Sequence, residues 1–99
     1  MGNFIRTKYL MPVISMFYGI IIRMFYYDNK EHKIPHIHIE YAEYNAVVSL
    51  PEANLLAGDF PKDKLKLVVA WVEIHKEALL ADWKLAVGGN SVFKIEGLK

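Results

Sequence analysis

The hydrophobic residues of this chain change their spacing at Pro61, and this change limits the folds that the chain can adopt. Before Pro61, short runs of β-branched and aromatic residues alternate with polar ones, as in strands with one buried face. After it, apolar residues recur at every third or fourth position until Gly88-Gly89, as in an amphipathic helix. The order of the two patterns predicts an α+β domain, with an antiparallel sheet in the N-terminal half and a helix packed on one of its faces.

Before Pro61, the predicted sheet has about four strands. They cover Tyr18–Tyr26, His36–Tyr41, Tyr44–Leu50 and a short run at Asn54–Ala57. The polar residues 28–33 form a loop between the first two strands. Pro35 is tolerated at the start of the second strand, where a missing backbone donor costs little.

A tight reversal at Ala42-Glu43 fixes the register of the second and third strands. This register pairs Tyr41 with Tyr44, Ile39 with Ala46, and Ile37 with Val48. The pairs form one continuous apolar face. We therefore expect His36, His38 and Glu40 on the opposite, half-exposed face.

The helical pattern runs from Lys62 to Val87, with Asp59 as a candidate N-terminal cap. An unbroken helix of this length would be about 39 Å long, which exceeds the ~33 Å expected across a domain of this size. We therefore predict a bend or break near residues 75–78, which gives two helices on the apolar face of the sheet. Residues 91–99 are expected to add a short strand or to lie across the surface.

The composition is that of one small folded domain. The 99 residues are 54% hydrophobic, carry a net charge of +1 and include no cysteine. Disulfides, zinc ribbons and thiol chemistry are therefore excluded. A charge so close to zero gives little support to binding of nucleic acid, because proteins that neutralise phosphates usually carry a large basic excess.

The N-terminal region divides into an extension, residues 1–10, and the start of a single domain, residues 11–99. The apolar run from Tyr9 to Ile22 is interrupted by Arg23 before it reaches the ~20 residues needed to span a bilayer. No small-residue cleavage site follows it. We therefore expect a cytoplasmic protein without a membrane segment.

The motif His36-x-His38-x-Glu40 is the leading candidate for chemistry. Residues two apart on a strand point the same way, so the two imidazoles can converge on one ligand. They could act as a catalytic acid and base, or bind a metal with Glu40, His32 or another residue as third ligand. Arg23 and Glu40 are candidate binding residues, with Arg23 placed to hold a phosphate or carboxylate. A purely structural role for the histidines remains open, and the sequence specifies no cofactor.

Several motifs resemble a small bacterial family catalogued as domain of unknown function 4160. They are Met11–Ile20 (MPVISMFYGI), Arg23-Met24, Pro35–Tyr41 (PHIHIEY), Leu67–Trp71 (LVVAW), His75, Leu79-Leu80 and Trp83. The resemblance extends from Met11 to about Leu98. It implies a sheet followed by helices, in small cytoplasmic proteins that have no established activity and are associated with toxin–antitoxin-like gene pairs. Ala42-Glu43 departs from the glycine-rich turn that is usual in the family, and Ile34-Pro35 from its Pro-Pro.

These observations leave three functions open. The first is a component of a toxin–antitoxin-like module, whose partner is a small protein encoded by a neighbouring gene. The second is a small hydrolase or nuclease that uses His36 and His38. The third is a non-catalytic module that docks a partner, or a second copy of itself, through a sheet edge or its helices.

Overall fold

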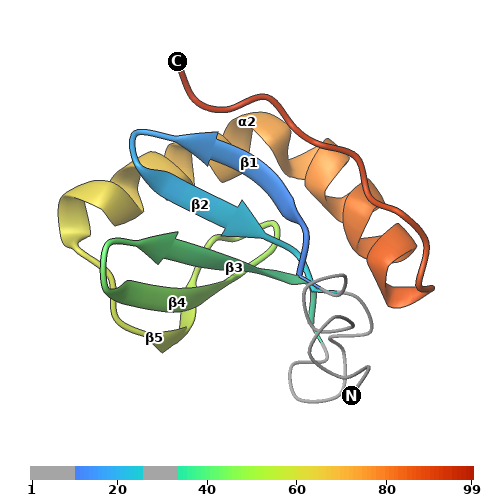
Figure 1. The fold of residues 1–99 in the computed structure, drawn as a ribbon, viewed down its shortest axis with the longest axis horizontal. Coiled ribbons are helices and arrows are strands. Elements are labelled where there is room, and N and C mark those ends of the chain that lie inside the picture. The colour runs from blue at the N-terminus through green and yellow to red at the C-terminus, as the bar shows by residue number, and fades with distance from the viewer. Residues whose placement is uncertain (1–10, 26–33) are drawn as a thin grey trace, which may run out of the picture.

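The computed structural model describes residues 11–25 and 34–99, which form an antiparallel sheet, one long helix and a C-terminal tail (Figure 1). The elements are β1 (Val13–Phe17), β2 (Ile20–Arg23), β3 (His36–Tyr41), β4 (Tyr44–Ser49), β5 (Leu55–Gly58) and α2 (Lys62–Val87). The sheet order β1-β2-β3-β4-β5 follows the chain. The predicted α+β class is confirmed. The proposed extension at residues 1–10, the loop at 28–33 and His32 lie outside the described residues.

The sheet contains five strands in place of the expected four, because the first predicted strand begins too late. Tyr18 and Gly19 form a turn, in which φ is 51° at Tyr18 and 79° at Gly19. Two positive φ values at the centre of a two-residue loop are typical of the hairpin turn that matches strand twist. Phe17 therefore pairs with Ile20, and β1 precedes the turn as a strand of its own.

The central hairpin has the register that the alternation predicts. Tyr41 pairs with Tyr44, Ile39 with Ala46, and Ile37 with Val48. Ile37 and Ile39 are buried against the helix side of the sheet. The first position of the connecting turn, Ala42, has a positive φ of 52°.

β5 joins β4 through an irregular register. The ladder shifts between Val47 and Val48, so that Ala57 lies opposite Val47 while Leu55 lies opposite Val48. Gly58 closes this strand with a φ of 85°, and a Cβ atom there would lie 2.3 Å from the carbonyl oxygen of Asn45. Only glycine permits so close an approach of the two backbones.

α2 covers the apolar face of the sheet in two segments. His75 has non-helical dihedral angles (φ −112°, ψ 19°) in the middle of the helix, so the predicted bend is confirmed. The predicted cap is wrong: the Asp59 carboxylate accepts a hydrogen bond from the Phe60 amide, and the helix begins after Pro61 without a side-chain cap. Asp59 is too far before the first helical residue to reach the helical amides. No helix in the described part of the chain is long and apolar enough to cross a membrane.

The core lies between the sheet and α2. The two tryptophans of α2 anchor different strands: the Trp71 ring lies 5.3 Å from that of Phe17, and the Trp83 ring lies 4.8 Å from that of His36. The largest side chains that are fully buried are Trp71, Ile14, Ile20, Ile22, Met24, Ile37, Ile39, Leu79, His36, Val48, Val68 and Val72.

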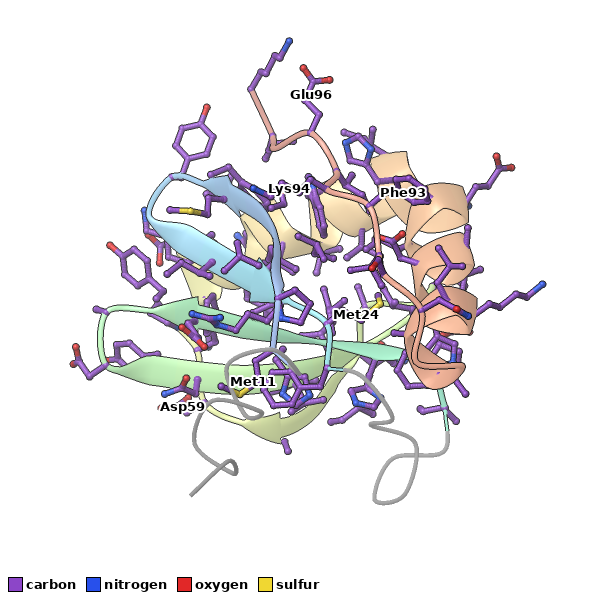
Figure 2. The ribbon with its side chains drawn as sticks, turned by 45° about the vertical axis from the view of Figure 1, so that its right-hand side comes forward. Met11, Met24, Asp59, Phe93, Lys94 and Glu96 are labelled. Atoms are coloured by element: carbon purple, nitrogen blue, oxygen red, sulfur yellow. The ribbon has the colours of Figure 1, made fainter. Side chains whose placement is uncertain are left out.

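The C-terminal tail, residues 90–99, returns along α2 to β1, where Lys94 and Glu96 mark its course (Figure 2). The Phe93 amide donates to the Asp82 carboxylate at 3.0 Å, and the Trp71 indole donates to the Glu96 carbonyl at 2.8 Å. The Ile95 amide donates to the Ile14 carbonyl of β1 at 2.7 Å. Of the two courses expected for this segment, it takes the one across the surface.

Candidate functional site

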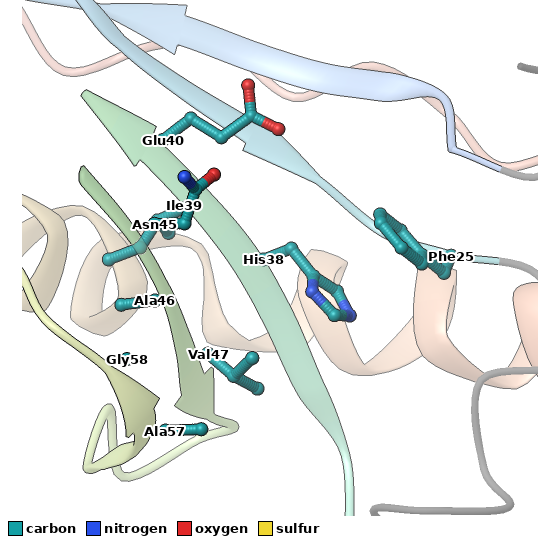
Figure 3. A pocket seen from close by; sticks show the side chains of 9 residues that line it. All are labelled: Phe25, His38, Ile39, Glu40, Asn45, Ala46, Val47, Ala57 and Gly58. Atoms are coloured by element: carbon teal, nitrogen blue, oxygen red, sulfur yellow. The ribbon is translucent and has the colours of Figure 1, made fainter. Parts of the chain in front are cut away.

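A pocket of about 260 Å³ lies on the face of the sheet that α2 does not cover (Figure 3). Its walls come from β3, β4 and β5, and from Phe25, two residues beyond the end of β2. The lining residues are Phe25, His38, Ile39, Glu40, Asn45, Ala46, Val47, Ala57 and Gly58. Two of the predicted site residues, His38 and Glu40, therefore share one hollow.

Arg23 and Glu40 form an ion pair across β2 and β3. The Arg23 Nε atom donates to Glu40 Oε2 at 2.9 Å, and its Nη1 atom donates to the Met11 carbonyl at 2.7 Å. The two side chains are about three-quarters and two-thirds buried. The predicted binding residues thus lie together, but the charge of Arg23 is already offset by Glu40, so an incoming anion would have to compete with this carboxylate.

His36 does not lie on a half-exposed face, as the strand alternation predicts, but is buried, with 1% of its surface exposed. Its Nδ1 atom lies 2.9 Å from the Ile34 carbonyl oxygen. Because a carbonyl only accepts, this hydrogen bond requires a proton on Nδ1. Trp83 of α2 contributes to this burial, since its indole ring lies 4.8 Å from the imidazole at the beginning of β3. Strand alternation alone does not show that α2 reaches this end of the sheet.

His38 is half-buried and belongs to a row of rings. The Phe25 ring stacks on it with 3.9 Å between centroids and 11° between planes, and the His36 ring meets it edge-on at 5.3 Å. The two histidines are therefore neighbours, as expected, but only His38 lines the pocket. His38 is the histidine through which this site can contact a ligand.

The candidate metal ligands His36, His38 and Glu40 do not form a site of three converging groups. Within residues 11–25 and 34–99, no three histidine, aspartate or glutamate side chains are placed to hold a metal ion. The alternative third ligand, His32, lies outside these ranges. What the described residues offer is a pocket with one imidazole and one carboxylate on its rim.

Sequence reasoning did not assign a role to Phe25 or Asn45, which complete the pocket. Asn45 lies directly opposite Glu40, and Val47 lies directly opposite His38. The predicted β3–β4 register was therefore enough to identify Asn45 as a neighbour of Glu40. Phe25 lies two residues beyond the end of β2, and its stacking on His38 becomes visible only in the fold.

The edge of the sheet at β5 is a second candidate site, because no described segment covers it, whereas the tail covers the opposite edge at β1. The tail lies along β1 and donates to the Ile14 carbonyl. No described segment lies along the outer side of β5, where Leu55 is 47% exposed and Leu56 is 36% exposed. All four residues of β5 are exposed.

Fold and site together define a small α+β domain whose sheet has a pocketed open face and one uncovered edge. A model of the family described as Domain of unknown function (DUF4160) matches residues 19–84 of the 99-residue chain. The chain belongs to this family, as its motifs indicated. No curated protein and no solved structure matches it.

Proposed function

We propose that this protein is the partner-binding component of a toxin–antitoxin-like pair and that it binds the other component through the edge of β5. The observation that carries the proposal is the difference between the two sheet edges. The tail covers β1, whereas the described part of the chain leaves β5 uncovered with two large apolar side chains exposed.

An uncovered edge strand presents a row of backbone donors and acceptors that can pair with another extended chain. Sheet proteins blunt such an edge with short strands, bulges, lysine, proline or a covering segment. β5 is short and pairs irregularly with β4, but its sequence, Leu55-Leu56-Ala57-Gly58, contains no charge and no proline. Main-chain pairing would supply affinity, and pockets for alternate side chains would supply specificity.

The occupant that we propose is an extended, apolar segment of a different protein, encoded by the neighbouring gene. In a symmetric dimer the same patch must serve both subunits. Two facing copies of a strand of four residues would bury much less than the ~1,200 Å² typical of a stable interface. A different protein can also contact surfaces beyond β5 and so bury a larger area than two paired copies of this strand.

A catalytic role for His36 and His38 together has less support. A catalytic pair must reach the proton that it transfers. His36 is buried, packs against Trp83 and is hydrogen-bonded to a backbone carbonyl. A hydrolase or nuclease would therefore have to rely on His38 and Glu40, the two titratable groups that line the pocket.

The test combines growth with binding. The gene is induced alone and together with its neighbour, and the two purified proteins are mixed to measure their affinity. We expect one gene to inhibit growth, the other to relieve the inhibition, and the two proteins to form a complex. The double variant Leu55→Lys with Leu56→Lys should weaken the complex at least about 100-fold, because charge on an edge strand opposes pairing.

Val69→Lys is the matched control, since Val69 is a similarly exposed apolar residue that belongs to α2 and not to β5. It should leave the affinity unchanged. The proposal fails if the double variant binds as well as the unmodified protein, or if neither gene affects growth. Light scattering that shows a dimer of this protein, abolished by the double variant, would replace the proposed partner by a second copy.

A further inference from the structure

The pocket on the open face has a floor and a rim of different chemistry. Val47 and Ala57, which are cross-strand neighbours, provide an apolar floor. Glu40 and Asn45, also cross-strand neighbours, place a carboxylate and an amide at one side (Figure 3). The stacked rings of Phe25 and His38 form the opposite wall. Such a combination fits a flat ring with polar atoms along one edge.

The hollow exists because β5 supplies small residues at this point. Ala57 lies opposite Val47, and Gly58 lies opposite Ala46, so no large side chain of β5 extends over β4 here. The resulting volume of about 260 Å³ exceeds the ~150 Å³ cavity that holds one benzene molecule. It therefore admits a single heteroaromatic ring system with a substituent.

The hydrogen-bonding groups on the rim determine which polar atoms the edge of a bound ring should carry. Glu40 is fixed by Arg23 through one carboxylate oxygen, and an ionised carboxylate has about four acceptor positions in total. It can therefore accept a further hydrogen bond from an amino group. Asn45 is exposed and offers both a donor and an acceptor, the pattern with which asparagine reads the amino group and ring nitrogen of adenine.

The charge around the pocket argues for a neutral ligand. No lysine or arginine is among the described residues that line it, and nearby Arg23 is already paired with Glu40. A phosphate group would find no uncompensated cation among these residues. We propose that this pocket binds an amino-substituted nucleobase, as the free base or nucleoside, with the ring over Val47 and Ala57 and the amino group at Glu40. The pocket shares Ala57 and Gly58 with β5, but it opens on the face of the sheet, whereas the partner is proposed to pair along the outer edge of that strand.

The test is a titration with adenosine, cytidine and uridine, followed through the backbone amide signals in NMR spectra. We expect adenosine and cytidine to shift the amides of His38, Val47 and Ala57, with Kd values of about 1 mM or lower. Uridine lacks the amino group and should bind about tenfold more weakly. Adenosine monophosphate should bind within about threefold of adenosine, because no unpaired cation is present to favour the phosphate.

Two variants separate this pocket from non-specific stacking. Ala57→Leu fills the hollow and should abolish the shifts. Glu40→Gln removes the charge that accepts from the amino group and should weaken adenosine about tenfold, whereas Glu43→Gln, in the exposed turn beside it, should have no effect. The proposal is overturned if adenosine causes no shifts at these amides, if uridine binds as well as adenosine, or if folded Ala57→Leu binds adenosine normally. None of these outcomes depends on the partner proposed for β5.

Discussion

The two edges of the sheet differ in how the rest of the chain covers them: β1 has buried residues, whereas all four residues of β5 are exposed. Along β1, the tail donates a hydrogen bond to Ile14, and Gly97 approaches so closely that a Cβ atom there would lie 2.7 Å from the Met16 carbonyl oxygen. Along β5, no described segment takes that place. One edge is therefore part of the fold and the other is available to a second molecule, a division that covering segments commonly create in sheet proteins.

The covered edge can be exposed by removing residues 91–99. This truncation strips the partly buried Val92, Ile95 and Leu98 from the core and leaves the Trp71 indole without its acceptor. We expect it to cost about 4 kcal/mol of unfolding free energy or more. Urea unfolding measures the loss. A loss below ~1 kcal/mol would show that the tail contributes nothing essential to the covered edge.

A second pair of variants compares the centre of the sheet with the open edge. Ile39→Ala leaves a cavity beneath α2 and should cost about 2–5 kcal/mol. Leu56→Ala on the exposed β5 should cost less than ~0.5 kcal/mol. His38→Ala, on the half-buried face, should fall between the two. Similar losses for Ile39→Ala and Leu56→Ala would mean that β5 is covered in solution.

The pH dependence of stability reports on the attachment of the tail at Asp82. This residue is 2% exposed, its Oδ1 atom accepts from Phe93, and its Oδ2 atom has no partner among the described residues. Burial raises the pKa of the Asp82 carboxyl above its ordinary value of 3.8, although the Phe93 amide partly opposes this rise. The folded protein therefore holds the proton more tightly than the unfolded chain does, and this gain is lost as pH rises through the raised pKa.

Asp82→Asn keeps an oxygen for the Phe93 amide and removes the buried charge. It should stabilise the protein by about 1 kcal/mol at pH 7, and the gain should disappear as the pH falls to about 4 and below. Urea unfolding of both proteins across this range measures the difference. Asp63→Asn, in the exposed first turn of α2, should be slightly destabilising at pH 7, since it removes a favourable charge at the helix N-terminus. A gain for Asp82→Asn that did not change with pH would contradict the assignment to the buried charge.

The smallest effect is expected at Ser15 on the covered edge. Its hydroxyl oxygen is buried without a hydrogen-bond partner in the described part of the chain. Ser15→Ala removes this unsatisfied group and should raise the stability by up to ~0.5 kcal/mol. A clear loss in thermal unfolding would show that the hydroxyl has a partner.

The parts of this fold that sequence could predict depend on local patterns. Alternation and the two-residue turn gave the pairing of Ile39 with Ala46, and helix length gave the bend at His75. The separation of β1 from β2 was missed although Gly19 signals a turn, because the apolar residues continue without interruption on both sides of it.

The remaining features depend on contacts between distant segments. The burial of His36 involves Trp83, which lies 47 residues further along the chain, in α2. The stacking of Phe25 on His38 and the course of the tail likewise join elements that no local pattern relates. The sequence could therefore indicate His36, His38 and Glu40 as a group. Only the fold shows that, of these three, His38 and Glu40 line the pocket and His36 does not.

The kink at His75 lies between the two attachments of the tail to α2. Trp71, before the kink, donates to the Glu96 carbonyl, and Asp82, after it, accepts from the Phe93 amide. The tail therefore bridges the two segments of the helix on its way to β1. A change in the bend would move these two attachments relative to each other, so the geometry at His75 is also a condition for covering the β1 edge.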